Sequence, residues 1–136
     1  MRDVQRVARG QGLAHRFAAR LQFGVVQVDA VPEHLRQRRG VHAEALTVAR
    51  SLGAREAIFV REDGLVTEGS ISNVFVERDG KLLTPPAALG LLPGVLRRQL
   101  LDEGRAEEAE LTLDDLAQGF FIGNATRGLL SAMLQP

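Results

Sequence analysis

The chain has 136 residues, which is enough for one domain with a hydrophobic core but crowded for two. Hydrophobic residues make up 45% of it and the formal net charge is zero, so neither a disordered chain nor a generally nucleic-acid-binding one is expected. Cysteine is absent, which excludes disulfides, thiolate catalysis and cysteine-based zinc sites, and we predict no metal site. No apolar run approaches the roughly 20 residues that cross a bilayer, so a soluble, cytoplasmic protein without a membrane partner is expected.

Charge is distributed unevenly, because most arginines before residue 51 have no acidic counterpart. The pattern over residues 2–21 predicts an amphipathic helix with apolar side chains at Val4, Val7, Leu13, Phe17 and Leu21. An arginine-rich organelle transit peptide is the alternative. A nucleic-acid role for this basic segment is disfavoured, because the chain has few aromatic side chains on which bases could stack.

Lysine is rare in this chain: of 17 basic residues, only Lys81 is a lysine. A mechanism that requires a lysine amine must therefore use Lys81 or take the amine from another chain.

A compact apolar stretch, Phe23–Val28, predicts a strand that Pro32 closes. The segment from Gly40 to Leu52 predicts a helix, with Gly53 as its stop. The apolar face expected for this helix consists of Val41, Ala45, Val48, Ala49 and Leu52.

Two hairpins are predicted next, because Asp-Gly turns separate short apolar runs. The first joins residues 57–61 to residues 65–67 through Asp63-Gly64, and the second joins residues 73–77 to residues 81–84 through Asp79-Gly80. Two β-hairpins in succession favour an antiparallel, meandering sheet.

Beyond the hairpins, Pro93-Gly94 precedes a predicted helix over Val95–Leu101, whose exposed side is expected to carry Arg97 and Arg98. Residues 112–115 have the pattern of a helix N-terminus, with acids where the helix dipole favours them. Residues 119–122 predict a buried strand, and residues 123–126 the turn after it. The order of elements is mixed α+β.

Three segments in a fixed order resemble one family. Residues 67–75 (TEGSISNVF), residues 83–96 (LTPP, then GLLPGVL) and residues 121–128 (FIGNATRG) resemble signatures of fold type IV pyridoxal phosphate enzymes, the class IV aminotransferases and 4-amino-4-deoxychorismate lyases. The resemblance covers about Gly24 to the C-terminus. It implies the C-terminal, cofactor-binding domain of D-amino-acid aminotransferase-like enzymes, an α+β fold whose mixed or antiparallel sheet forms a pseudo-barrel with flanking helices.

The resemblance implies a cofactor, pyridoxal 5′-phosphate, and positions that bind it. Glu68 matches the carboxylate that contacts the pyridine nitrogen and keeps it protonated, which lets the ring accept electrons. Without the neighbouring motif, the same residue would be interpreted as a water-exposed end of a hairpin.

Two further matches concern the cofactor phosphate. Gly94 and Val95 match the helix N-terminus whose backbone N–H groups grip it, and Asn124 and Ala125 match a second gripping turn. Leu96 stands where the family usually offers a hydroxyl, so one contact is expected to be missing.

The Schiff-base lysine of the family has no counterpart in this chain. The family's lysine holds the cofactor and transfers the proton, but Leu35 occupies the matching position. Arg36 stays protonated and cannot act as the nucleophile, and His34 could move a proton but could not hold the cofactor. No catalytic residue is therefore assigned.

The resemblance also implies a preceding domain that closes over the cofactor and excludes water. Here residues 1–23 form a short basic segment, a remnant of that lid or a substitute for it, and residues 24–136 form the cofactor domain. We expect a homodimer, or a second polypeptide that completes the site. The implied ancestral chemistry is amino-group transfer or lyase chemistry, impaired in this chain; the alternative is a non-catalytic binding or assembly domain.

Overall fold

The structure is a computed structural model that describes the backbone of residues 22–28 and all of residues 40–134. The predicted helix over residues 2–21 and the predicted lysine-equivalent position, Leu35, lie outside the described residues. None of the described helices is long and apolar enough to cross a membrane. In chain order the elements are β1 (Gln22–Val28), α3 (Val41–Ser51), β2 (Glu56–Val60), β3 (Val66–Gly69), β4 (Asn73–Arg78), β5 (Lys81–Thr84), η2 (Ala87–Leu89), α4 (Val95–Asp102), β6 (Ala106–Glu108), α5 (Leu113–Leu116), β7 (Phe120–Asn124) and β8 (Gly128–Leu134).

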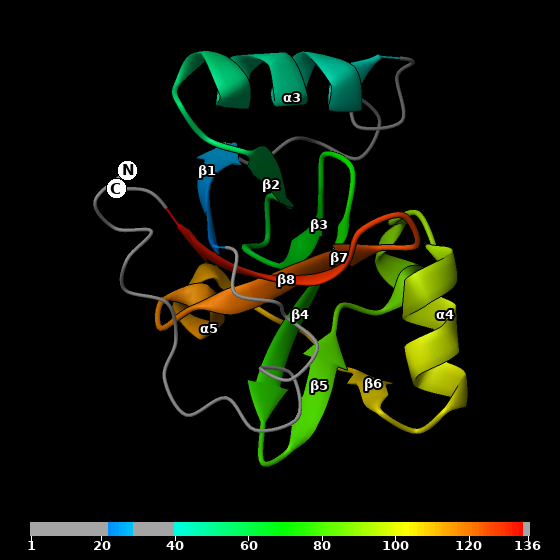
Figure 1. The fold of residues 1–136 in the computed structure, drawn as a ribbon. Helices are drawn as coiled ribbons and strands as arrows, with labels where there is room; N and C mark the ends of the chain where they lie inside the picture. Colours follow the sequence, from blue (N-terminus) through cyan, green and yellow to red (C-terminus); the bar gives the residue numbers. More distant parts are fainter. Residues whose placement is uncertain (1–21, 29–39, 135–136) are drawn as a thin grey trace.

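The described strands form one mixed sheet in the order β3-β2-β1-β8-β7-β4-β5-β6. Strand β1 is parallel to both of its neighbours, β2 and β8, whereas the pairs β2/β3, β4/β5, β4/β7 and β7/β8 are antiparallel. The two edges approach each other, because Leu65 bridges Thr112 and the Val66 N–H donates to the Leu111 carbonyl at 2.8 Å. The sheet thus curls into a pseudo-barrel, with α3 and α4 on its outside (Figure 1). The predicted α+β fold class is confirmed. The prediction of an antiparallel meander was wrong for β1, which is parallel to both neighbours, and for the parallel pair β5/β6.

Both predicted hairpins are present. In the first, the Arg61 N–H donates to the Leu65 carbonyl at 2.8 Å, and Gly64 has a φ of 89°. In the second, Arg78 pairs with Lys81 across a two-residue turn in which Asp79 and Gly80 have φ values of 55° and 80°. Positive φ at both turn positions is what a two-residue turn needs to match the twist of its strands.

The predicted helix after Gly40 is present as α3, but its apolar face differs from the prediction. Ala49 is buried, whereas Val48 and Leu52 are 53% and 60% exposed. The helix packs through small side chains, because Ala45 and Ala49 contact Ala54 and Ala57. Gly53 ends the helix as expected, with a φ of 82° and its N–H donating to the Arg50 carbonyl at 3.0 Å.

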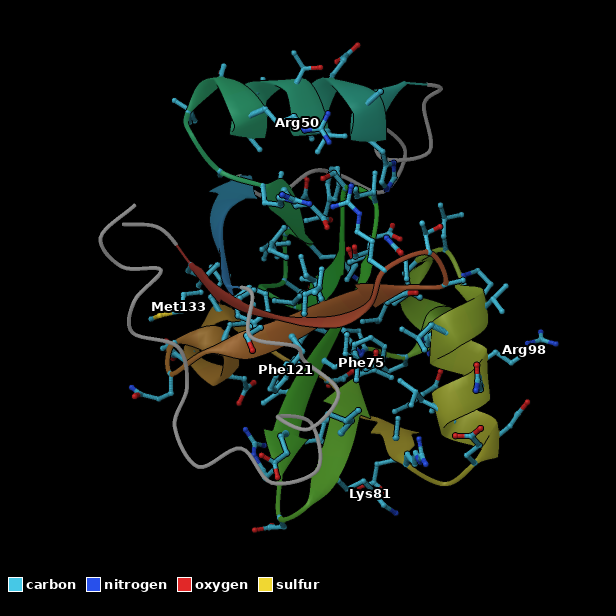
Figure 2. All side chains as sticks on the ribbon, viewed as in Figure 1. Arg50, Phe75, Lys81, Arg98, Phe121 and Met133 are labelled. Carbon is cyan, nitrogen blue, oxygen red and sulfur yellow. The ribbon has the colours of Figure 1, made fainter. Side chains whose placement is uncertain are left out.

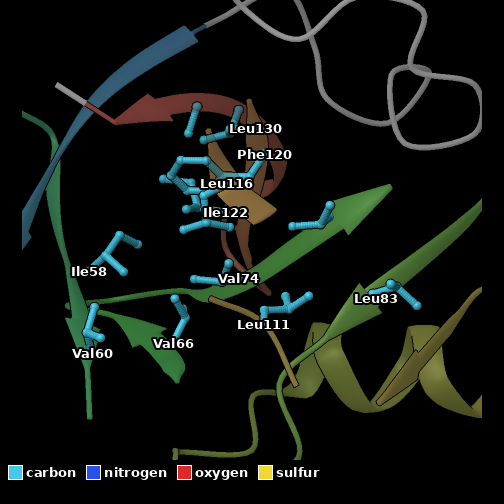
Figure 3. Packing of buried hydrophobic residues seen from close by; sticks show 12 residues of the cluster. Ile58, Val60, Val66, Val74, Leu83, Leu111, Leu116, Phe120, Ile122 and Leu130 are labelled. Atoms are coloured by element: carbon cyan, nitrogen blue, oxygen red, sulfur yellow. The ribbon is translucent and has the colours of Figure 1, made fainter. Parts of the chain in front are cut away.

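Two apolar clusters cover the two faces of the sheet. Because strands buried on both faces need apolar side chains at successive positions, their sequences are uninterrupted apolar runs. On β4 and β7 the side chains alternate, so that Val74 and Ile122 join the first cluster while Phe75 and Phe121 join the second, which α4 covers (Figure 2). The first cluster, shown in Figure 3, consists of Ile58, Val60, Val66, Val74, Val76, Leu83, Leu111, Leu116, Phe120, Ile122, Leu130 and Ala132.

The predicted helix start at Thr112 is confirmed as a capping box. The Asp115 carboxylate accepts hydrogen bonds from the Thr112 N–H at 2.8 Å and from the Thr112 hydroxyl at 3.2 Å. The predicted strand at residues 119–122 is present as β7, but β6 and β8 had no counterpart in the prediction.

Replacing Gly80 with alanine should lower the free energy of unfolding by about 1–2 kcal/mol, because an L-residue is strained in the left-handed region. A Cβ at this position would meet no atom within 4 Å, so backbone strain is the only cost. Gly80→Asn is the matched control, since asparagine adopts positive φ more readily and should lose less. Urea unfolding of the two variants measures the difference; equal losses would contradict the explanation.

Candidate functional site

A cavity of about 210 Å³ lies where β3, the loop before α4 and the end of β7 meet. Its lining contains a carboxylate, an imidazole, hydroxyl and amide groups, and the backbone that leads into α4. The residues that line it are His42, Glu68, Gly69, Ser70, Ile71, Ser72, Asn73, Leu92, Gly94 and Asn124. Three of the five predicted cofactor-binding positions, Glu68, Gly94 and Asn124, are therefore brought together at one cavity.

Glu68 is 3% exposed and lies on β3 opposite Phe59 of β2. One carboxylate oxygen accepts a hydrogen bond from the Leu92 N–H at 3.0 Å, and the other lies 3.1 Å from His42 Nε2. The His42 ring also packs against the Phe59 ring, with centroids 4.6 Å apart. Helix α3 and the loop before α4 thus hold the carboxylate in place at the cavity wall.

The start of α4 is anchored by Asn73. Its side-chain amide donates to the Leu92 carbonyl at 3.0 Å, and its Oδ1 lies where a Cβ on residue 94 would be. A Cβ on residue 94 would clash with the Asn73 amide, and Gly94 has an ordinary extended conformation, so close approach rather than φ explains the residue. Among the described residues, no side chain caps this helix. Its first N–H groups have no intrahelical acceptor and can bind an anion.

Val95 and Ala125 do not line the cavity with their side chains, and both are exposed. Each directly follows a lining residue, and the interaction expected of each is through its backbone. Their role in cofactor binding remains a prediction.

Asn124 organises the turn after β7. Its Oδ1 accepts hydrogen bonds from the Thr126 N–H at 3.0 Å and the Arg127 N–H at 2.9 Å. Its Nδ2 donates to the Ile71 carbonyl at 3.1 Å and to Ser72 Oγ at 3.4 Å. Within the structure the amide therefore joins the turn to the wall of the cavity, a function the sequence did not predict.

Glu56 was also not identified from the sequence, where it precedes an apolar run. It is 1% exposed, and its two oxygens accept hydrogen bonds from the Ile71 N–H at 3.0 Å and the Ser72 hydroxyl at 2.7 Å. Burial raises the pKa of the Glu56 carboxyl, and the hydrogen bonds from Ser72 and Ile71 partly offset this. No pattern in the sequence joins residue 56 to residues 71 and 72.

Arg97 corrects the prediction that its side chain is exposed. It is 4% exposed, and its guanidinium donates to the Pro85 carbonyl at 3.0 Å and pairs with Glu108. The hydrogen bond from the Ala87 N–H, followed by that from Arg97, lowers the pKa of Glu108. Arg97 thus fastens α4 to the β5–η2 connection and β6, whereas Arg98 faces outward as expected (Figure 2).

The fold and the three motifs point to one family, and comparison with known proteins agrees. Residues 28–133 match the amino-transferase class IV family, and the chain belongs to that family. It is 34% identical over 86 residues to a putative aminodeoxychorismate lyase of Schizosaccharomyces pombe, a match that covers 60% of this chain and 37% of that protein. It is 40% identical over 85 residues to a D-alanine aminotransferase of Bacillus licheniformis, covering 57% of this chain and 30% of that protein.

Among solved structures, a putative amino-acid aminotransferase from Mesorhizobium loti is 38% identical, with a TM-score of 0.76. That match covers 87% of this chain and 62% of the solved one. A putative 4-amino-4-deoxychorismate lyase from Legionella pneumophila has a TM-score of 0.72 at 21% identity and shows a shared fold. The chain therefore spans only part of the length of the proteins it matches.

The raised pKa of Glu56 predicts a pH dependence. A carboxyl whose folded pKa is raised contributes stability below its unfolded value of 4.5, and this contribution is lost as the pH rises through the folded pKa. The unaltered chain should therefore lose stability as the pH is raised from 4.5 toward neutrality. Glu56→Gln cannot ionise, so its free energy of unfolding should increase relative to that of the unaltered chain over this range. Urea unfolding over a pH series measures this, and a pH-independent difference would refute it.

Proposed function

We propose that this chain is the cofactor-binding half of a class IV aminotransferase or aminodeoxychorismate lyase site and that it binds pyridoxal 5′-phosphate without a covalent bond. The observation that carries the proposal is that Glu68, Gly94 and Asn124 line the same cavity. They come from three separate motifs of the sequence.

The groups at the cavity fit the cofactor's two polar ends. The Glu68 carboxylate lines the cavity and is a hydrogen-bond acceptor, so it can accept the proton of a ring nitrogen. The start of α4 can supply N–H groups for the phosphate, and the backbone of Ala125 is the expected second donor, since the Thr126 and Arg127 N–H groups already donate to Asn124 Oδ1. When bound, the cofactor would supply an electron-accepting ring for amino-acid chemistry.

The chain alone lacks the amine that this chemistry needs. Leu35 matches the lysine position, and a leucine side chain is neither a nucleophile nor a base. No lysine lines the cavity, and Lys81 lies on the β4–β5 hairpin with its Nζ 3.7 Å from Glu107 (Figure 2). We therefore propose that amino-group transfer or lyase activity requires a second polypeptide or has been lost.

Glu68→Gln should weaken pyridoxal 5′-phosphate binding by about tenfold, because a neutral amide loses the charge-assisted hydrogen bond to a protonated ring. Glu62→Gln, on the exposed first hairpin turn, is the matched control and should bind normally. Equilibrium dialysis with the cofactor measures both. Equal affinity of the two variants would contradict the assignment of Glu68.

Leu35→Lys should create a covalently attached cofactor, seen as a yellow absorbance that survives dialysis and is abolished by borohydride. The unaltered chain and Leu35→Met should show no such absorbance. A covalent cofactor on the unaltered chain would refute the proposal, and absence of binding by the lysine variant would count against both the alignment and the site.

Assembly without catalysis is the second candidate function. It is favoured by the apolar side chains beside the cavity, since Leu92 and Val95 are 67% and 71% exposed and Ile71 is also exposed. A homodimer or a second polypeptide would cover them. In sedimentation velocity, replacing Leu92 and Val95 with serine should dissociate such an assembly, and an unchanged sedimentation coefficient would argue against it.

A further inference from the structure

The turn formed by residues 69–72 makes one wall of the cavity, and Glu56 holds this turn from inside the protein. Glu56 itself does not line the cavity. Its carboxylate accepts the Ile71 N–H and the Ser72 hydroxyl, while the Ser70 N–H donates to the Ala57 carbonyl at 3.0 Å. The turn is thus fixed by strand β2, two residues of which supply its acceptors.

The hydrogen bonds continue from Glu56 through Ser72 to Asn124 at the end of β7. A hydroxyl has one proton, and the proton of Ser72 is directed to Glu56 at 2.7 Å. Its lone pairs therefore face Asn124 Nδ2, 3.4 Å away. This favours the orientation of the Asn124 amide in which Oδ1 accepts the N–H groups of Thr126 and Arg127, the same orientation that the Ile71 carbonyl favours by accepting from Nδ2 at 3.1 Å.

Glu56 also explains the glycine that follows Glu68. A Cβ on residue 69 would lie 2.6 Å from Glu56 Oε1, and the Gly69 N–H donates to the Ser72 carbonyl at 2.8 Å. The buried carboxylate thus occupies the space that any other residue at position 69 would need. Gly69 and Glu56 form one packing unit beneath the cavity.

We infer that Glu56 is a positioning residue for the phosphate end of the cavity, acting through Ser72 and Asn124 on the turn at residues 125–127. The inference rests on the proposed function for the identity of the ligand. The contacts among Glu56, Ser72 and Asn124 stand without it. Because Glu56 acts on the Asn124 turn and does not touch the carboxylate of Glu68, it should affect recognition of the phosphate more than that of the ring.

The test uses Glu56→Gln, which keeps the size of the side chain. Its amide oxygen can still accept the Ile71 N–H, but its NH₂ group would donate to Ser72 and compete with Asn124. Asp115→Asn is the matched control, because Asp115 makes the same kinds of contact with a backbone N–H and a hydroxyl at α5.

Affinities for pyridoxal 5′-phosphate and for pyridoxal, which lacks the phosphate, are measured by equilibrium dialysis. Glu56→Gln should lose about tenfold in affinity for the phosphorylated compound and less than about twofold for pyridoxal, the larger change corresponding to one lost hydrogen bond. Asp115→Asn should change neither. Equal losses for the two compounds, or no loss, would overturn the inference.

Ser72→Ala provides a second variant that leaves the buried carboxylate in place. It should show the same selective loss as Glu56→Gln, and the double variant should lose no more than either single one, because both break the same chain of contacts. Additive losses would mean that Glu56 acts independently of Ser72, against the inference.

Amide hydrogen exchange in ligand-free protein separates this inference from the proposed function. Thr126 and Arg127 should exchange faster in Glu56→Gln than in the unaltered chain, and at the unaltered rate in Asp115→Asn. Faster exchange together with no cofactor binding by the unaltered chain would refute the proposed function while supporting the coupling. Unchanged exchange would refute the coupling whatever binds.

Discussion

The cavity depends on two buried carboxylates that the fold must supply with hydrogen-bond donors. An unpaired charge inside a protein is strongly destabilising, so Glu56 and Glu68 fix the segments that satisfy them. Glu68 is satisfied by the Leu92 N–H and by His42 of α3, and Glu56 by Ile71 and Ser72. The walls of the cavity are thus loops and a helix held by carboxylates that project from two adjacent strands.

The pseudo-barrel makes this arrangement possible because it is packed on both faces. The first apolar cluster lies on one face and the second lies between the sheet and α4. Asn73 fixes the start of α4 through its hydrogen bond to the Leu92 carbonyl, and Arg97 fixes the buried side of the helix through its hydrogen bond to the Pro85 carbonyl. The uncapped helix start is consequently presented at the cavity that Glu68 lines.

The chain belongs to the amino-transferase class IV family, yet it spans 37% of the Schizosaccharomyces pombe relative and 62% of the Mesorhizobium loti structure. The described residues contain the positions matched to ring nitrogen and phosphate. They do not include Leu35, where the family's amine would stand. The proposal accordingly separates cofactor binding, which these positions would support, from catalysis, which needs an amine.

The sequence alone determined the two Asp-Gly hairpins, the end of α3 at Gly53 and the capping box at Thr112. Each of these features depends only on residues that are close together in the chain. The motifs also identified Glu68, Gly94 and Asn124 as candidates for one site. Only the tertiary structure decided that β1 lies between β2 and β8, that Arg97 is buried, and that Glu56 and His42 support the cavity. These features depend on contacts between residues far apart in sequence, and a charged residue carries no local mark of whether a distant donor will meet it.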